Sequence, residues 1–180
     1  PQIKKAKKAK SKKAKKLTPS PQKFKSEKEI QKYLQTQCLK SVCGFLNSEG
    51  GDLIIGVKEL NNRKKETLDI KNEIGFSNLD QFERHFAQLI SNRIGQNFLA
   101  QYVQTEFHHF GKKTLLLVRV KKFIPLIGQI PALLDGELLF TRTGPRTDPV
   151  APGKPFAEFV SGRRQMSGFF QKTISRLKGN

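Results

Sequence analysis

The sequence predicts an α+β domain preceded by a basic tail. Three observations support this fold class: amphipathic helix patterns, two hairpin signals in the second half, and the absence of an internal repeat. Helices that alternate with antiparallel hairpins favour packed helices on a single mixed, largely antiparallel sheet. We divide the 180 residues into a lysine-rich tail with a proline linker (1–22), a folded domain (23–150) and a basic C-terminal helical extension (151–180).

The positive charge is large and unevenly placed. The net charge is +19, and residues 1–26 contribute eleven lysines and no acid. Residues 1–16 offer no apolar face, so we expect this segment to be disordered on its own. Such a charge favours polyanionic partners, nucleic acid above all. A contact with nucleic acid competes with two simpler interpretations of the tail, a solubilising segment and a nuclear-import signal.

Membrane and secreted classes fit the sequence poorly. No apolar run approaches the ~20 residues that span a bilayer, and the lysine-rich start lacks the apolar stretch of a signal peptide. We therefore expect no membrane partner. Cys38 and Cys43 are too few for a secreted disulfide framework, which favours a reducing compartment. We expect the nucleus or another RNA-rich intracellular compartment, with mitochondria left open.

The first predicted helix begins at Ser26, because residues 26–29 fit a capping box. After it come Gly50 and Gly51 and a short apolar strand at 53–57. A P-loop needs a strand before its glycines and a helix after them, and here the order is reversed. We expect Asn47 and the two glycines to end the helix and turn the chain through positive φ. The apolar stripe of this helix is Ile30, Tyr33, Leu34, Cys38, Val42, Phe45 and Leu46.

The remaining elements are predicted in chain order. A polar loop at 61–67 precedes a second helix, which is capped by Ser77 and whose apolar positions continue to Ile94. Strands at about 98–109 and 114–122 flank a turn at 110–113. The Asp135-Gly136 pair predicts a second hairpin, with its second strand at 138–142. One or two short helices are expected from Pro155 onward.

Three segments in this order resemble the Schlafen-type AlbA-like domain, also described as a divergent ATPase-like or putative DNA-binding domain. KSVCGFLNSEGGDLIIGV (40–57) is similar to its Asn-x-x-Gly-Gly, strand, Gly-Val pattern, and NLDQFERHFAQLISNRI (78–94) to its next helix. KTLLLVRVKKFIPLIGQIPALLDGELLFTRTG (113–144) is similar to its strand, Pro, Gly, strand, Arg-x-Gly pattern. The resemblance covers residues 23–150 and implies an α/β fold that acts on nucleic acid.

Several relatives are implied to be metal-dependent endoribonucleases, in which three carboxylates hold a divalent ion. At the matching positions this sequence has Thr18, Lys23 and, after Gly56-Val57, Lys58 followed by Glu59. Glu59 is therefore the one weak catalytic candidate, and the cations beside it repel a metal ion. We expect no enzyme activity, no metal and no cofactor. A Schlafen-like endoribonuclease, or an inactive subunit of one, is the alternative.

Zinc binding is a weaker interpretation still. His108 and His109 with the two cysteines lack zinc-finger spacing, and adjacent residues of a strand face opposite ways.

The predicted function is a non-catalytic nucleic-acid-binding module, RNA favoured over DNA, within a ribonucleoprotein that includes protein subunits. A protein-interaction platform with a nuclear-targeting tail is a further alternative. Tyr102, Phe110 and Phe123 are candidates to stack on unpaired bases. Arg142, in the Arg-x-Gly pattern, is the strongest single candidate outside the tail. The predicted nucleic-acid-binding residues are Lys4, Lys5, Lys7, Lys8, Lys10, Lys12, Lys13, Lys15, Lys16, Lys23, Lys25, Lys112, Lys113, Lys121, Lys122, Arg142, Arg146, Arg163 and Arg164.

Overall fold

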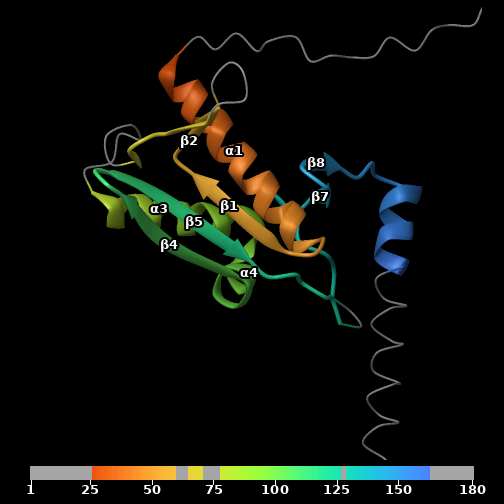
Figure 1. Ribbon diagram of the computed structural model, residues 1–180. Coiled ribbons are helices and arrows are strands. Elements are labelled where there is room, and N and C mark those ends of the chain that lie inside the picture. The colour runs from red at the N-terminus through yellow and green to blue at the C-terminus, as the bar shows by residue number, and fades with distance from the viewer. Residues whose placement is uncertain (1–25, 60–64, 71–77, 127–128, 163–180) are drawn as a thin grey trace, which may run out of the picture.

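The computed structural model describes residues 26–59, 65–70, 78–126 and 129–162. Helices and antiparallel strands alternate along these ranges (Figure 1), which confirms the α+β class. The helical elements are α1 (Glu27–Leu46), α3 (Leu79–Ile90), the π-helix η1 (Ser91–Gly95) and α4 (Gln96–Tyr102), followed by helical residues 154–162. The strands are β1 (Gly51–Ile55), β2 (Val57–Glu59), β3 (Lys65–Thr67), β4 (Val103–Phe110), β5 (Lys113–Val120), β6 (Leu133–Leu134), β7 (Leu138–Thr143) and β8 (Arg146–Pro149).

Within the described ranges, the strands form three antiparallel sheets instead of the single sheet that the sequence predicted. The central sheet has the order β1-β5-β4, β2 pairs with β3, and the third sheet has the order β6-β7-β8. Two interruptions of the strand structure separate these sheets. Gly56 has a φ of 103°, which bends the chain between β1 and β2. Pro125 and Pro131 fall between β5 and β6, where their missing N–H groups interrupt strand pairing.

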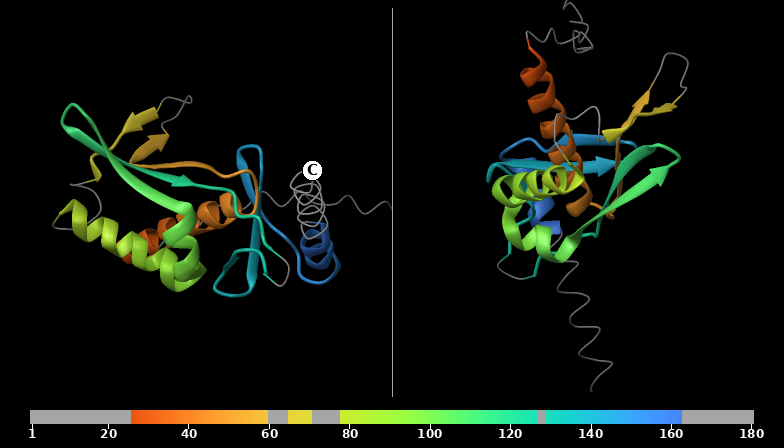
Figure 2. Two further views of the ribbon diagram at one scale, coloured as in Figure 1. Left: turned by 90° about the horizontal axis from the view of Figure 1, so that it is seen from below. Right: turned by 90° about the vertical axis from the view of Figure 1, so that its left-hand side faces the viewer.

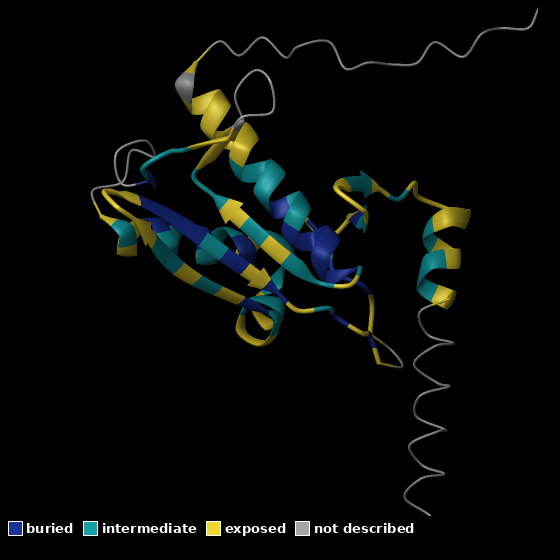
Figure 3. Ribbon diagram, in the orientation of Figure 1, coloured by how far each residue is buried: buried dark blue, intermediate teal, exposed yellow. Residues whose placement is uncertain are grey.

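The C-terminal half of α1 lies in the core, where it packs mainly against β7 of the third sheet and also against the central sheet. Leu39, Val42 and Leu46 are fully buried, as are Leu116 and Val118 of β5. The N-terminal half projects away from the sheet and is exposed (Figure 3), and Leu34 is 55% exposed. The helix begins as predicted, because the Ser26 Oγ accepts the Glu29 N–H at 3.3 Å. The predicted apolar stripe is therefore buried mainly in its second half.

The helices α3, η1 and α4 follow one another, with a break at Gly95, where φ is 138°. They lie beside α1, which they contact through the Gln35–His85 and Thr36–Arg93 hydrogen bonds, and pack against the same core. Asn78 caps α3, with its Oδ1 accepting the Gln81 N–H at 2.8 Å. The predicted cap, Ser77, lies outside the described residues. The strand predicted from residue 98 begins at Val103, because residues 98–102 continue the helix. Phe98, Leu99 and Tyr102 are spaced to lie on one helical face, and they pack against the core.

Both predicted hairpins are present. The β4–β5 hairpin turns at Gly111-Lys112, and Asp135 and Gly136 turn the β6–β7 hairpin with φ values of 57° and 75°. The strand predicted at 53–57 is divided at Gly56 into β1 and β2. Two further strands are additional: residues 65–67, predicted as loop, form β3, and Arg146–Pro149 forms β8. Both are short and polar, so they lack the apolar alternation that indicates a strand. The helix expected from Pro155 is described over 154–162, and its continuation lies outside the described residues.

Candidate nucleic-acid interface

The turn between α1 and β1 is a closely packed corner. Gly50 has a φ of 77°, and a Cβ there would lie 2.6 Å from the carbonyl oxygen of Val120. A Cβ on Gly51 would lie 2.2 Å from the ring of Phe45. The Gly50 N–H donates to the Phe45 carbonyl oxygen at 3.1 Å, so that amide is already engaged within the turn. These contacts favour a purely structural role for this turn over binding of a phosphate by its backbone amides.

Asn47 joins this corner to two distant segments. Its side chain is 3% exposed, and Nδ2 donates to the carbonyl oxygens of Ala132 at 2.7 Å and Phe140 at 3.0 Å. Its Oδ1 accepts the Ala132 N–H at 3.0 Å. One amide therefore satisfies three backbone groups that have no access to water. The φ of Asn47 is −87°, so the prediction of positive φ is wrong for this residue and correct for the glycines.

Arg142 lies on β7 beside the corner. Its backbone N–H donates to the Ser48 Oγ at 2.8 Å, and its Nη1 donates to the Thr147 Oγ1 at 3.2 Å. The guanidinium carbon lies 4.5 Å from the centroid of the Phe45 ring, a cation–π contact. The strongest predicted candidate outside the tail is thus held against α1 and β8 by its own side chain.

Two further predicted cations of this region are paired with acids. The Lys122 Nζ lies 2.6 Å from the Glu49 carboxylate, and the Arg146 Nη2 lies 2.9 Å from Asp148. Lys121 is exposed. We call Glu49, Lys121, Lys122 and Arg142 the turn surface, because the Gly50 corner packs directly on the backbone of residues 120–122. Its positive charge is partly neutralised by Glu49.

Lys112 and Lys113 lie at the opposite end of β5. An eight-residue strand rises about 3.3 Å per residue, so roughly 25 Å separates them from the lysines of the turn surface. The Lys113 Nζ donates to the Thr67 carbonyl oxygen at 2.5 Å, which connects this hairpin to β3. The predicted cations of the described domain therefore occupy two separate places instead of one patch.

The three aromatic candidates also differ in position. Phe98 packs edge-on to Phe123 with ring centroids 4.9 Å apart, and Tyr102 does so at 5.3 Å. Phe123 is 6% exposed, so it is a core residue and not a stacking surface. Phe110, at the end of β4, is 61% exposed. Among the three, Phe110 has a ring that a ligand can reach.

The other predicted contact residues, in the tail and at Arg163 and Arg164, lie outside the described residues, as do Thr18 and Lys23. Glu59 belongs to β2 and is paired in register with Lys65. Within the described ranges, no group of three or more His, Cys, Asp or Glu residues is placed to hold a metal ion. No helix in that part of the chain is long and apolar enough to cross a membrane.

The cysteines and histidines occupy structural positions. Cys38 and Cys43 are free thiols, and burial raises the pKa of each to about 11, so both stay protonated at neutral pH. His108 lies 3.5 Å from Glu106, while the His109 Nδ1 lies 3.1 Å from the Thr114 Oγ1. The two histidines therefore have different neighbours, as expected for adjacent residues of a strand.

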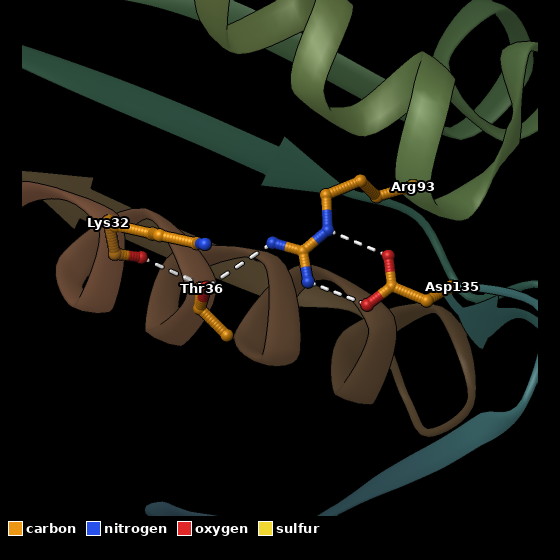
Figure 4. Close-up of polar contacts among 4 residues, drawn as sticks. All are labelled: Lys32, Thr36, Arg93 and Asp135. Atoms are coloured by element: carbon orange, nitrogen blue, oxygen red, sulfur yellow. Dashed lines mark hydrogen bonds and ion pairs between the residues drawn. The ribbon is translucent and has the colours of Figure 1, made fainter. Parts of the chain in front are cut away.

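An ion pair between Arg93 and Asp135 was not predicted (Figure 4). Arg93, in η1, donates from Nε and Nη2 to the two carboxylate oxygens of Asp135, at 2.7 and 2.6 Å. Its Nη1 donates to the Thr36 Oγ1 of α1 at 3.2 Å. The hydrogen bonds between the pair lower the pKa of Asp135 and raise that of Arg93. The Asp-Gly signal identified Asp135 as a turn residue, and nothing in the sequence indicated its partner.

Comparison with protein families agrees with the sequence patterns. A family model described as Schlafen, AlbA_2 matches residues 4–150. Among solved structures, the crystal structure of the DIP2311 protein from Corynebacterium diphtheriae is similar, with 20% identity and a TM-score of 0.44. That similarity covers 73% of this chain and 22% of the other. No curated protein matches this chain.

Proposed function

We propose that the chain, which belongs to the Schlafen, AlbA_2 family, is a non-catalytic nucleic-acid-binding module that favours RNA over DNA. Membership in this family suggests a nucleic-acid-related function. The observation that carries the proposal is the net charge of +19, with eleven lysines and no acid in residues 1–26. Each phosphate that a lysine neutralises releases counterions, which favours binding. The resemblance to endoribonucleases favours RNA as the ligand.

The non-catalytic part of the proposal is supported by the residues at the family's acidic positions. Thr18 and Lys23 replace two of the three expected carboxylates, and Lys58 precedes the third, Glu59. A divalent ion is held by several oxygen ligands, and neighbouring cations oppose its binding. We further propose that the protein acts within a ribonucleoprotein in the nucleus or another RNA-rich compartment.

The folded domain contributes further cations to the proposed nucleic-acid binding, besides those of the tail. Lys112 and Lys121 are exposed, at opposite ends of β5. The Arg142 guanidinium is oriented by Phe45 and Thr147, and this reduces the side-chain entropy lost when it contacts a phosphate. The tail supplies most of the long-range attraction in this proposal, and the domain supplies fixed contacts.

Fluorescence anisotropy with labelled single-stranded RNA, hairpin RNA and duplex DNA tests the proposal. We would compare the full chain with residues 26–180, which keep the Ser26 cap of α1. Titrations between about 50 and 200 mM salt should give a log–log slope of about 0.7 for each phosphate contact on a single strand. We expect both proteins to bind, the full chain with the steeper slope, and RNA to be the tightest ligand.

The same samples, incubated with Mn²⁺ and run on a denaturing gel, test for catalysis. We expect the RNA to remain intact. Cleavage that disappears in Glu59→Gln would instead establish the metal-dependent nuclease. If neither protein binds nucleic acid at physiological salt, the domain is better explained as a protein-interaction platform.

A further inference from the structure

The β4–β5 hairpin presents an open aromatic ring at its tip. Phe110 is 61% exposed and is paired in register with Lys113. Gly111 forms the turn with a φ of 61°, and a Cβ built on it would meet nothing within 4 Å. Neither the ring nor the turn beside it is covered by another described segment. A planar ligand can therefore approach Phe110 from solvent.

Two lysines lie at this tip. Lys112 and Lys113 belong to the same hairpin, and the 2.5 Å bond from the Lys113 Nζ to the Thr67 carbonyl oxygen holds the β2–β3 pair next to it. In the right-hand view of Figure 2, the β2–β3 strands lie above the β4–β5 hairpin on the same side of the molecule. Lys58 and Lys65 are exposed on β2 and β3, but each lies opposite an acid, Lys58 opposite Glu66 and Lys65 opposite Glu59. We call Phe110, Lys112 and Lys113 the hairpin surface.

The turn surface lacks this combination of charge and an open ring. Its Lys122 is paired with Glu49, and its Arg142 is stacked on Phe45. The nearby ring of Phe123 is 6% exposed. Among the described residues, then, an accessible phenylalanine and lysines without a described acidic partner come together at the hairpin surface. A carbonyl contact, such as that of Lys113, leaves the lysine charge in place.

We propose that the hairpin surface binds single-stranded RNA, with Phe110 stacked on an unpaired base and Lys112 and Lys113 contacting the flanking phosphates. This inference rests on the proposed function and adds its site and the kind of strand it selects. Stacking on an aromatic side chain needs a free base face, which a base inside a duplex does not offer. The hairpin surface therefore discriminates by strand pairing and not by base sequence.

Tryptophan fluorescence gives a direct test, because the chain contains no tryptophan. Phe110→Trp in the full chain introduces a single fluorescent tryptophan at the proposed contact. We expect single-stranded RNA to quench it, with the same midpoint as the anisotropy titration, and duplex RNA to leave it nearly unchanged. Tyr33→Trp, at the exposed start of α1, is the matched control and should not respond to either ligand.

Affinity supplies the second measurement. Phe110→Ala should weaken single-stranded RNA binding about 5- to 100-fold, the range expected for loss of one stacked base, and duplex binding less than about two-fold. Two variants remove equal charge from opposite ends of β5. Lys112→Ala with Lys113→Ala should cost about ten-fold, and Lys121→Ala with Lys122→Ala no more than about three-fold, because Lys122 is already paired with Glu49.

The results separate this inference from the proposed function. If the wild-type chain binds RNA but Phe110→Trp shows no quenching and Phe110→Ala binds as tightly as wild type, the hairpin surface is not the site and the proposed function stands. Equal losses from the two lysine pairs would also overturn the site. If the wild-type chain binds no nucleic acid, both proposals fail. Circular dichroism confirms that each variant is folded.

Discussion

Asn47 offers the sharpest test of a single side chain in the fold. Asn47→Ala would leave the N–H of Ala132 and the carbonyl oxygen of Phe140 buried without this partner. The carbonyl oxygen of Ala132 would keep its hydrogen bond from the Cys43 Sγ at 3.2 Å. We expect the free energy of unfolding to fall by about 3 kcal/mol, because each unsatisfied buried group costs about 1–3 kcal/mol and the site relaxes in part. Urea denaturation measures the change.

The matched control is Asn97→Ala at an exposed position of α4, which should change stability by less than about 0.5 kcal/mol. Similar losses in the two variants would mean that the hydrogen bonds of Asn47 contribute little.

Asn47 also illustrates what a sequence can and cannot reveal about one residue. An asparagine ahead of a glycine pair indicates a helix end, and α1 does end there. Its partners are 85 and 93 residues away, so only the packing of α1 against β7 brings them together. Arg142 is similar: the Arg-x-Gly pattern selected it, but its position over Phe45 depends on tertiary packing.

Among the chain's turns, the α1–β1 corner and the β4–β5 turn use glycine for different reasons. Gly50 and Gly111 both have positive φ, 77° and 61°, which costs an alanine roughly 1–2 kcal/mol. At Gly111 that is the whole penalty, because its surroundings are open. At Gly50 the added Cβ would also meet the Val120 carbonyl oxygen at 2.6 Å and the Lys122 nitrogen at 3.0 Å.

We therefore expect Gly111→Ala to lower the free energy of unfolding by about 1 kcal/mol and Gly50→Ala by roughly 3 kcal/mol or more. Parallel thermal or urea unfolding of the two variants measures the difference. Equal losses would show that the corner does not pack closely on residues 120–122.

Local periodicity predicted the longer elements and missed the shorter ones. The apolar spacing of α1 and α3, and the turn residues of two hairpins, are signals contained within a few residues of sequence. β3 and β8 are stabilised by partners and not by their own pattern. Residues 98–102 carry aromatic residues typical of strands, yet their spacing also fits the helical face that packs on the core.

Across the whole molecule, the net charge predicts a polyanionic ligand but does not indicate which cations are accessible to it. Lys112-Lys113 and Lys121-Lys122 look equivalent in sequence. In three dimensions one pair lies beside an open aromatic ring, and the other lies at a corner where Glu49 binds one of its members. The location of the acids, set by the fold, decides which cations remain available to an anionic ligand.

The Arg93–Asp135 ion pair connects parts of the molecule that are far apart in sequence: α1 through Thr36, η1, and the β6–β7 turn. The pKa of Asp135 is lowered, chiefly by the hydrogen bonds from Arg93. A carboxylate with a lowered pKa stabilises the fold at pH values above its ordinary pKa of about 3.9, and this contribution is lost as the pH falls through the folded-state value. Acid should therefore weaken this connection.

Asp135→Asn tests the connection and its pH dependence together. The Asp135 side chain is 45% exposed, so solvent screens the pair and we expect a loss of about 0.5–1 kcal/mol at neutral pH. The difference from wild type should shrink as the pH falls through the lowered folded-state pKa of Asp135, where the wild-type carboxylate becomes protonated. Urea unfolding across this pH range measures it, with Glu137→Gln, exposed in the same turn, as a control that should differ little from wild type. A loss that is equally large in acid would mean that Asp135 acts through the geometry of its turn and not through the charge that it shares with Arg93.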